Sequence, residues 1–547
     1  MTPRRKTTAP LIDRLTARRS RLPHPTAWEK ETVRIPLRDG ERLAADVYTP
    51  TVRSKGVLLV RTPYGRGIAM GLGFARVWAG QGYTVVYVAT RGTNGSTGTF
   101  DPMRTETTDG HDVVAWLREQ PWYPGTFATF GHSYLGYTQW AILADPPEDL
   151  VASVVMEGPH DFSRHAWGTG SFHYDIFGWA EMVRMIHHHS PRDLLAALRG
   201  RTARNAAVSA VPVLPAADAA FKDVAPWLPE RLERPDLDDP FVAPMQHADA
   251  LQSTTVPTLV IAGWQDIFLV QSMEQYRTLQ ERGVTVRLIA GAWGHTNMDN
   301  KVVRPAVLNW LDAHLAGTVL ADKWGVDVEF TPAGSWRHLE QWPPTDAGEL
   351  MLHPAPGRAL VEDAPASDAG SDAAATASFR FDPADPTPST GGNEMSGGGY
   401  RDDSHLAERP DVLTFDTAVL DRDVTLAGAP RLTLRHTAEL PDVDLFVRIS
   451  DVDAGGRSTN VTETFRRVIG EHEAVELELL DTAHVFAAGH RIRLTVAGGW
   501  FPFYSRNPGT GENPLTAETL HPNRHTVTFG EGTALVLPTL PTPPTEA

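Results

Sequence analysis

The sequence predicts an α/β domain followed by an all-β domain, and three observations indicate this fold class. Short apolar runs alternate with helical stretches over the first 318 residues, as in a parallel, doubly wound sheet. One serine lies in a glycine-flanked turn between a predicted strand and a predicted helix. Beyond residue 318 the helical patterns stop, and short strands separated by turns predict a β-sandwich of the jelly-roll type.

Composition excludes several classes of function. The chain has 547 residues, a net charge of −17 and no cysteine. The charge argues against a nucleic-acid partner and against an anionic membrane surface. The lack of cysteine excludes disulfides, thiolate metal sites and thiol nucleophiles. No run reaches the ~18 apolar residues of a membrane span, and the Arg-rich start lacks the apolar core of a secretory signal, so we expect a cytoplasmic protein.

The α/β domain is predicted to be interrupted by an insertion. Between about residues 160 and 245, helical spacing and proline-rich breaks replace the strand pattern, which indicates a helical cap over the sheet. The expected organisation has five parts: a basic extension (1–24), the first part of the core (25–159), the cap (160–245), the second part of the core (246–318) and the β jelly roll (319–547).

The segment Gly131-His132-Ser133-Tyr134-Leu135-Gly136 is the most informative stretch of the chain. A β-prone run precedes it and a helical run follows it, so the serine marks a sharp strand-to-helix turn. Such a turn lifts the hydroxyl above the sheet and directs helix N–H groups toward the place where an oxyanion forms. This is the nucleophile elbow of α/β-hydrolases, with the second glycine one residue late. A serine in an ordinary glycine-rich turn is the alternative.

A serine nucleophile needs a histidine base and a carboxylate that orients the base. In α/β-hydrolases these residues follow in the order serine, acid, histidine, each in a loop beyond a strand. Asp266 follows the strand predicted at 258–263, and His295 follows the strand predicted at 284–290. Ser133, Asp266 and His295 are therefore the predicted catalytic residues.

The oxyanion hole needs two donors. The backbone N–H of Tyr134, directly after the nucleophile, is the first. The second should come from the loop after an early strand, which reads Arg61-Thr62-Pro63-Tyr64. Proline has no N–H to donate, so we favour the hydroxyl of Tyr64, with a packed aromatic side chain as the alternative.

Aromatic side chains of the cap and of the acid and histidine loops are candidates for the substrate pocket. They are Trp167, Phe172, Phe177, Trp264 and Trp293. Packing inside the insertion is the alternative for the cap residues. The run His187-His188-His189 suggests a metal site, but consecutive residues of a helix point in different directions. We expect no metal and no organic cofactor.

Several motifs, taken together, carry a resemblance to a known family. They are Thr62-Pro63-Tyr64, the hexamer around Ser133, Gly263-Trp264-x-Asp266, Gly291-x-Trp293-Gly294-His295, Phe381-Asp382-Pro383-Ala384-Asp385-Pro386 and Gly489-His490-Arg491-Ile492-Arg493-Leu494. This set resembles the cocaine esterase / Xaa-Pro dipeptidyl-peptidase family of serine hydrolases. The resemblance implies an α/β-hydrolase domain, an inserted helical cap and a C-terminal jelly roll of the galactose-binding-like type. It also implies the triad and the two oxyanion donors named above.

The predicted reaction is acyl transfer from an ester or amide to water through an acyl-enzyme. Substrates with a free amine would need an anionic anchor, and four acidic residues lie in the right region: Glu157, Asp161, Asp175 and Glu181. We favour a carboxylesterase acting on small or aromatic acyl esters. An Xaa-Pro dipeptidyl-peptidase, amidase or α-amino acid ester hydrolase is the runner-up, and a catalytically inactive carbohydrate-binding protein is the alternative of another class. The expected partner is thus a small ester or amide, and the sequence leaves a homo-oligomer open.

Overall fold

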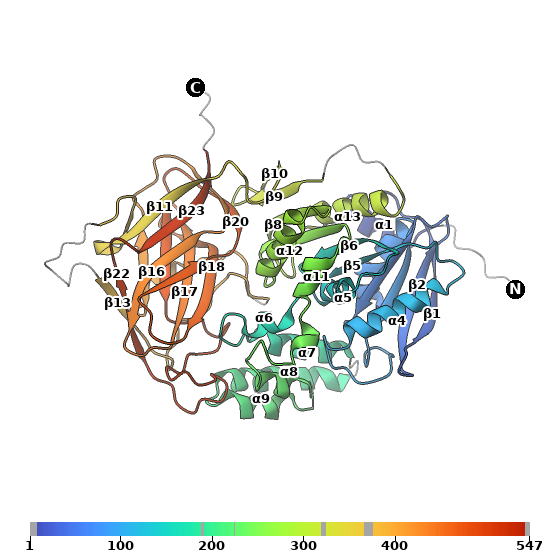
Figure 1. Cartoon of the computed structure of the whole chain (residues 1–547), viewed down its shortest axis with the longest axis horizontal. Coiled ribbons are helices and arrows are strands. Elements are labelled where there is room, and N and C mark those ends of the chain that lie inside the picture. The colour runs from blue at the N-terminus through green and yellow to red at the C-terminus, as the bar shows by residue number, and fades with distance from the viewer. Residues whose placement is uncertain are drawn as a thin grey trace, which may run out of the picture.

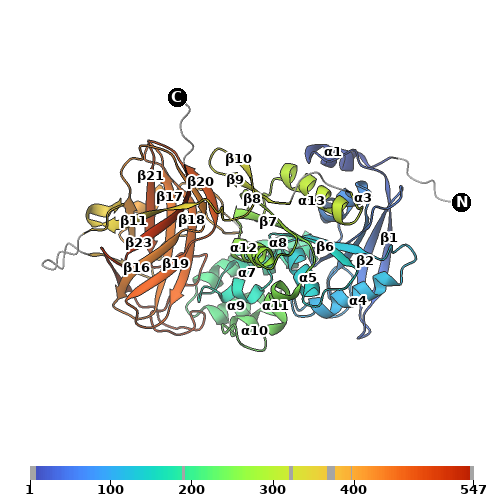
Figure 2. The same ribbon diagram turned by 45° about the horizontal axis from the view of Figure 1, so that its top comes forward.

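The computed structural model describes residues 8–187, 191–223, 225–318, 324–365, 376–395 and 397–541. An α/β domain and an all-β domain lie side by side, and a group of helices beneath them contacts both (Figure 1). The same arrangement is visible in the turned view (Figure 2). No helix in these ranges is both long enough and apolar enough to cross a membrane.

The α/β domain is built on a ten-stranded sheet in the order β1-β2-β4-β3-β5-β6-β7-β8-β9-β10. An antiparallel hairpin forms one edge, and strands from β4 to β9 run parallel. The strands are β1 (Trp28–Pro36), β2 (Arg42–Pro50), β3 (Val57–Thr62), β4 (Thr84–Ala89), β5 (Phe127–His132), β6 (Leu150–Met156), β7 (Thr258–Gln265), β8 (Val286–Gly294), β9 (Val326–Phe330) and β10 (Ser335–Leu339). The predicted α/β fold is confirmed.

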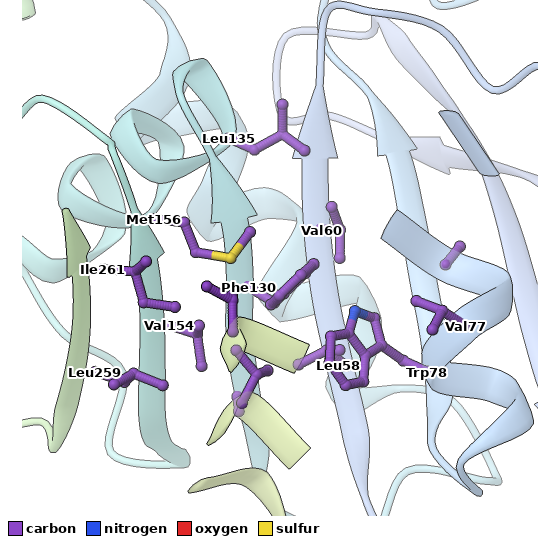
Figure 3. Close-up of a cluster of buried hydrophobic side chains, with 14 of the residues drawn as sticks. Leu58, Val60, Val77, Trp78, Phe130, Leu135, Val154, Met156, Leu259 and Ile261 are labelled. Atoms are coloured by element: carbon purple, nitrogen blue, oxygen red, sulfur yellow. The ribbon is translucent and has the colours of Figure 1, made fainter. Parts of the chain in front are cut away.

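Helices cover both faces of this sheet, which is why its central strands are apolar throughout. One face carries α1 (Leu11–Arg19), α2 (Ile68–Gly71), η1 (Leu72–Arg76), α3 (Val77–Gly80) and α13 (Asn300–His314). The other carries α4 (Glu106–Arg118), α5 (Tyr134–Leu143), α11 (Ala248–Ser253) and α12 (Leu269–Glu281). Figure 3 shows Trp78 of α3 packed over Leu58 of β3 and beside Phe130 of β5.

The helical cap is inserted between β6 and β7. It contains α6 (Phe162–Trp167), α7 (Asp175–His187), α8 (Pro191–Ser209), α9 (Val213–Phe221), α10 (Leu228–Leu232) and η2 (Ala243–Met245). The cap has an apolar core of its own, which includes Phe177 and Phe221. His188 and His189 of the histidine run lie outside the described residues, as does the side chain of His187.

The C-terminal domain is all-β, as predicted. Its elements are β11 (Gly348–Ala355), η3 (Pro356–Arg358), β12 (Ala359–Val361), β13 (Thr376–Phe381), η4 (Ser404–Glu408), β14 (Val412–Asp416), β15 (Val424–Gly428), β16 (Arg431–Ala438), β17 (Val443–Val452), β18 (Ser458–Val468), β19 (Ala474–Glu478), β20 (Thr482–Phe486), β21 (Arg491–Ala497), β22 (Asn523–Thr528) and β23 (Ala534–Leu540). These strands enclose a separate apolar core.

One boundary differs from the expected organisation. The segment after residue 318 was assigned to the second domain, yet β9 pairs in parallel with β8, and β10 pairs antiparallel with β9. Both strands therefore extend the first sheet. The strand that β9 pairs with, β8, lies in the α/β domain. The local sequence does not reveal which sheet a strand joins, because that depends on its neighbour in space.

Candidate active site

Ser133 lies at the turn from β5 into α5, with φ 61° and ψ −126°, a backbone conformation that residues other than glycine seldom adopt. Its N–H donates to the Met156 carbonyl on the neighbouring strand at 2.9 Å, which anchors the turn. The serine side chain thereby stands above the carboxyl end of the sheet, close to the N-terminus of α5.

Two glycines allow the chain to pack this closely. A Cβ at Gly131 would lie 2.3 Å from Leu135 Cβ, and a Cβ at Gly136 would lie 2.6 Å from Gly158 Cα. Neither distance is compatible with a side chain. The glycine that comes one residue late therefore has a packing role against the end of β6, while Leu135 is buried in the core.

The structure brings the three predicted catalytic residues together. The hydroxyl of Ser133 donates to His295 Nε2 at 2.8 Å, and His295 Nδ1 donates to Asp266 Oδ2 at 2.6 Å. The other oxygen of Asp266 accepts the N–H of Phe268 at 2.8 Å, so the carboxylate is held in place. An imidazole bonded in this way can take a proton from the hydroxyl and remain oriented while it carries positive charge.

The two predicted oxyanion donors also meet at the nucleophile. The Tyr64 hydroxyl accepts a hydrogen bond from Trp179 Nε1 at 3.0 Å. Burial raises the pKa of Tyr64, while hydrogen bonds with Trp179, with Ser133 and with the backbone of Tyr134 lower it. Because burial is the larger effect, the phenol keeps its proton at neutral pH and can donate it to an oxyanion.

Two pockets include Ser133 in their walls. The enclosed pocket has a volume of about 60 Å³, and its wall includes Phe162, Trp167 and Phe172. That volume holds about four water molecules. Its lining is almost entirely apolar.

The open pocket is larger, at about 430 Å³, and runs between α13 and the η1 segment. Its wall includes Phe74 of η1, which is a π-helical turn, a feature often found at functional sites. Ser133 and His295 border both pockets, so the two groups on either side of a bond cleaved at Ser133 could lie one in each pocket.

The predicted pocket residues fall into two groups. Trp167 and Phe172 line the enclosed pocket, as expected. Phe177, Trp264 and Trp293 line neither pocket, so that prediction was wrong for them. Phe177 belongs to the cap core, with its ring 4.9 Å from the ring of Phe221.

The two tryptophans of the acid and histidine loops have structural positions instead. Trp264 packs on Trp342 with ring centroids 5.4 Å apart, and its Nε1 donates to the Glu329 carbonyl at 2.8 Å. A Cβ at Gly291 would lie 1.9 Å from the indole of Trp293, so this glycine makes room for a core side chain. Neighbouring residues on a strand point to opposite faces, which directs these side chains away from the substrate.

Of the four acidic candidates for an amine anchor, Asp175 alone lines the enclosed pocket. Burial raises its pKa to about 6, and its Oδ2 accepts the N–H of Met395 at 3.0 Å. Asp161 caps α6, and Glu181 pairs with Arg204 at 3.0 Å. Glu157 lies behind the site, beside His295, rather than in a pocket.

Two further residues border both pockets: Trp179, one of the cap aromatics that the sequence offers as possible pocket residues, and Met395, which no motif indicates. Trp179 belongs to the run of cap aromatics, and its spacing on a helix gave no means of separating it from core residues. Met395 comes from the all-β domain, 100 residues beyond His295 in the chain. No local pattern marks such a residue, since only the docking of the two domains brings it to the site.

Within the described ranges, one group of side chains has the spacing of metal ligands: His132, Glu157 and His295, whose ligand atoms lie within 4.8 Å of one another. Both nitrogens of His295 are already hydrogen-bonded, to Ser133 and to Asp266. Glu157 is bonded to His132 at 2.8 Å. The arrangement is therefore a hydrogen-bonded network rather than an open ligand set.

Comparisons with known proteins agree with this architecture. The X-Pro dipeptidyl-peptidase (S15 family) model matches residues 39–297, and the X-Pro dipeptidyl-peptidase C-terminal non-catalytic domain model matches residues 319–537. Cocaine esterase from Rhodococcus sp. (strain MB1 Bresler) is 28% identical over 539 residues, which cover 88% of this chain and 92% of the relative.

Two solved structures share the whole fold. An aminopeptidase from the marine sediment archaeon Thaumarchaeota archaeon has a TM-score of 0.78 at 22% identity and covers 99% of both chains. An α-amino acid ester hydrolase has a TM-score of 0.79 at 22% identity, covering 98% of this chain and 99% of its own. The tandem family matches and the cocaine esterase relative, with the fold in agreement, show that this chain belongs to the S15 / cocaine esterase family of serine hydrolases.

Proposed function

We propose that the chain is a carboxylesterase for esters with a small or aromatic acyl group, with Ser133 as nucleophile, His295 as general base and Asp266 as the acid that orients it. The observation that carries this proposal is the unbroken chain of hydrogen bonds from Asp266 through His295 to Ser133, next to an enclosed apolar pocket. A neutral apolar group fits that lining better than a charged one, because a charge would lose its hydration there.

In this mechanism Ser133 Oγ attacks the ester carbonyl while its proton passes to His295 Nε2. The negative oxygen of the tetrahedral intermediate accepts hydrogen bonds from the Tyr64 hydroxyl and the Tyr134 N–H. His295 then gives the proton to the departing alcohol, and the acyl group stays on Ser133. Water enters, loses a proton to His295 in the same way, and releases the acid.

A second candidate is the hydrolysis of α-amino esters or amides, and one observation favours it. Asp175 is the one acidic side chain among the described residues that line the enclosed pocket, whose other charged side chains are Arg231 and Arg234. An ammonium group bound there would favour the ionised carboxylate and would offset part of its desolvation. Under this alternative Asp175→Asn removes the preference for a free amine over its acetylated form.

The deciding experiment compares wild type, Ser133→Ala and the control Ser253→Ala, an exposed serine on α11. The substrates are p-nitrophenyl butyrate and an Xaa-Pro anilide, and a fluorophosphonate reports the reactive serine. We expect ester turnover and labelling in wild type and control, and a loss of at least about 10³-fold in Ser133→Ala. Ester turnover that persists in Ser133→Ala contradicts the proposal. Anilide turnover lost in that variant favours the peptidase, and a lack of labelling favours a binding protein.

A further inference from the structure

A second carboxyl group lies beside the imidazole of His295. Glu157 is the first residue after β6, is fully buried, and has a φ of 44°. Its N–H donates to the Ile261 carbonyl at 2.8 Å, which fixes this turn to β7. Its Oε2 lies 3.8 Å from His295 Nδ1, the nitrogen that Asp266 contacts at 2.6 Å. Two carboxyl groups therefore converge on one nitrogen.

The topology accounts for this convergence. The strands β5, β6, β7 and β8 are successive neighbours in the sheet and run parallel, so their carboxyl ends meet at one edge. Ser133 follows β5, Asp266 follows β7 and His295 follows β8. Glu157 follows β6, so it leaves the sheet between the nucleophile and the acid.

His132 links Glu157 to the ring of His295. Glu157 Oε2 lies 2.8 Å from His132 Nε2. The two imidazole rings lie face to face, with centroids 4.6 Å apart and planes 31° apart. His132 also hydrogen-bonds to the backbone of His295. Glu157 thus holds His132 against one face of the ring whose Nδ1 it flanks.

Electrostatics indicate where the proton of this pair resides. Burial, and next the charge of Asp266, raise the pKa of Glu157 well above its ordinary value. Burial lowers the pKa of His132. Both shifts favour the uncharged pair, in which the Glu157 carboxyl group donates to a neutral imidazole nitrogen of His132. This leaves one negative charge, that of Asp266, to stabilise the imidazolium that forms during the reaction.

We propose that Glu157 is a positioning residue and a reserve acid, which orients His295 through His132 and replaces Asp266 at Nδ1 when Asp266 is lost. This role rests on the proposed function, because it needs His295 to be the base for Ser133. Without Asp266 the second cause of the raised pKa of Glu157 is absent while burial remains, so Glu157 releases its proton to solvent at a lower pH than in wild type. The Glu157 Oε2 lies 3.8 Å from His295 Nδ1 in the wild-type structure, so in the variant it needs to move by about 1 Å to accept a hydrogen bond.

The test is a double-mutant cycle on kcat/KM for p-nitrophenyl butyrate, with Glu157→Gln, Asp266→Ala and the double variant. Asp161→Asn is the matched control in both backgrounds. Asp161 is a buried carboxyl group near the same edge of the sheet, but its Oδ1 is bonded to Ser163 Oγ at 2.5 Å and to the Arg164 N–H at 3.0 Å. Ser133→Ala sets the baseline, and circular dichroism with thermal unfolding checks that each variant is folded.

We expect Glu157→Gln alone to lower kcat/KM by less than about 5-fold and Asp266→Ala to lower it by about 10²-fold, with a further loss of about 10²-fold in the double variant. Asp161→Asn should add nothing to Asp266→Ala. Equal rates in Asp266→Ala and in Asp266→Ala/Glu157→Gln overturn the reserve-acid role and leave the proposed function intact. Activity in Ser133→Ala overturns the proposed function itself.

The pH profile separates this role from a purely structural one. The titratable groups that face Glu157 are His132 from β5, Asp266 after β7 and His295 after β8. In wild type, log(kcat/KM) should rise with a slope of about one on the acid side, because only the imidazole has to lose a proton. In Asp266→Ala both His295 and Glu157 have to lose one, so the slope approaches two. An unchanged slope overturns the proposal even if the double variant fails to fold.

Discussion

The Tyr64 hydroxyl is placed to act as a donor at the moment of attack. Trp179 occupies its acceptor side at 3.0 Å, which leaves its own proton for the oxyanion. Tyr64→Phe should therefore lower kcat by about 10²- to 10³-fold with KM changed by less than about 3-fold, because the interaction strengthens in the transition state.

Steady-state kinetics on p-nitrophenyl butyrate check this loss. Tyr123→Phe is the matched control, since the Tyr123 hydroxyl is bonded to Asp149 at 2.6 Å. Both residues precede their strands, β5 and β6, and so lie at the opposite ends of the strands from Ser133. A wild-type kcat in Tyr64→Phe would show that the Tyr64 hydroxyl is not part of the oxyanion hole.

Single residues were predictable where chemistry imposes a fixed order along the chain. Ser133, Asp266 and His295 each follow a strand, and that order with the loop positions was sufficient to bring them together in a hypothesis. Glu157 follows a strand as well, yet the sequence offers it only as a candidate amine anchor. Its contact with His295 depends on the neighbouring strands, which the local sequence does not specify.

At the scale of elements, α13 gives the open pocket a positive charge. Arg304 of α13 lines this pocket, donates to Ser20 Oγ at 2.8 Å, and forms no ion pair within the described ranges. Burial lowers the pKa of Arg304 because it disfavours the charged form, so an anionic partner would stabilise the guanidinium. We expect esters whose open-pocket group carries a carboxylate to be favoured about 10-fold over neutral isosteres.

A matched pair of substrates with a small acyl group tests this preference: 4-methylpentyl butyrate and 4-(butanoyloxy)butanoate, in which a carboxylate replaces an isopropyl group of the same shape. Arg304→Met should abolish the preference and leave turnover of the neutral ester unchanged, while Arg304→Lys should keep part of it. Equal kcat/KM for the two esters in wild type would show that Arg304 serves only to tie α13 to Ser20.

The junction between α7 and the all-β domain is expected to weaken as the pH rises. Burial raises the pKa of Asp175 to about 6 and that of Glu394 to about 8. A carboxyl group with a raised pKa in the folded state contributes stability below its unfolded pKa of about 4, and this contribution is lost as the pH climbs through the folded value.

Thermal unfolding across pH measures the effect. Asp175→Asn should raise the midpoint by a few degrees at pH 8 and leave it nearly unchanged at pH 4. Asp249→Asn, an exposed carboxylate on α11, is the control with no expected trend. A constant difference between Asp175→Asn and wild type over this range would contradict the predicted pH dependence.

Elements were predictable as strands or helices, because apolar runs and helical spacing are local properties. Their partners were not always evident. The strands β9 and β10 look like the start of the second domain in sequence, but their backbone groups complete the first sheet. A strand is defined by its own residues, whereas its sheet is defined by whichever edge is free beside it.

At the scale of the whole molecule, the all-β domain supports the loop that carries Asp266. Asn460 Nδ2 of β18 donates to Gln265 Oε1 at 3.1 Å, and Gln265 Nε2 donates to the Val461 carbonyl at 2.9 Å. Gln265 directly precedes Asp266. Asn460→Ala should therefore lower kcat by about 3- to 10-fold, because the lost hydrogen bond to Gln265, about 1 kcal/mol, loosens the acid. The variant also loses the hydrogen bonds of Asn460 with the Arg401 N–H and the Gly399 carbonyl, which lie within the all-β domain.

The control for Asn460→Ala is Arg457→Ala, an exposed residue just before the start of β18 with 63% of its side chain accessible. KM should stay within about 2-fold in both variants, since neither side chain lines a pocket. A wild-type kcat in Asn460→Ala would mean that the acid loop holds its position without help from the second domain.

The tandem order of domains was foreseen through the family resemblance, but their docking was not. It depends on pairs such as Trp264 with Trp342, and on Met395 reaching the pockets across the junction. Such contacts join residues far apart in the chain, and each partner alone resembles an ordinary buried side chain. The misassigned role of Trp264 has this cause.

The dependence of the site on Met395 and Asn460 means that hydrolysis reports on the assembly of the molecule as well as on its chemistry. If the β-sandwich moved away from the hydrolase sheet, Met395 would leave the pockets and Asn460 would lose its contact with Gln265 beside Asp266. Both domains could remain folded during this motion. Heating or mild denaturant should thus abolish turnover before either domain unfolds. The rate of inactivation would then report the rate at which the two domains separate.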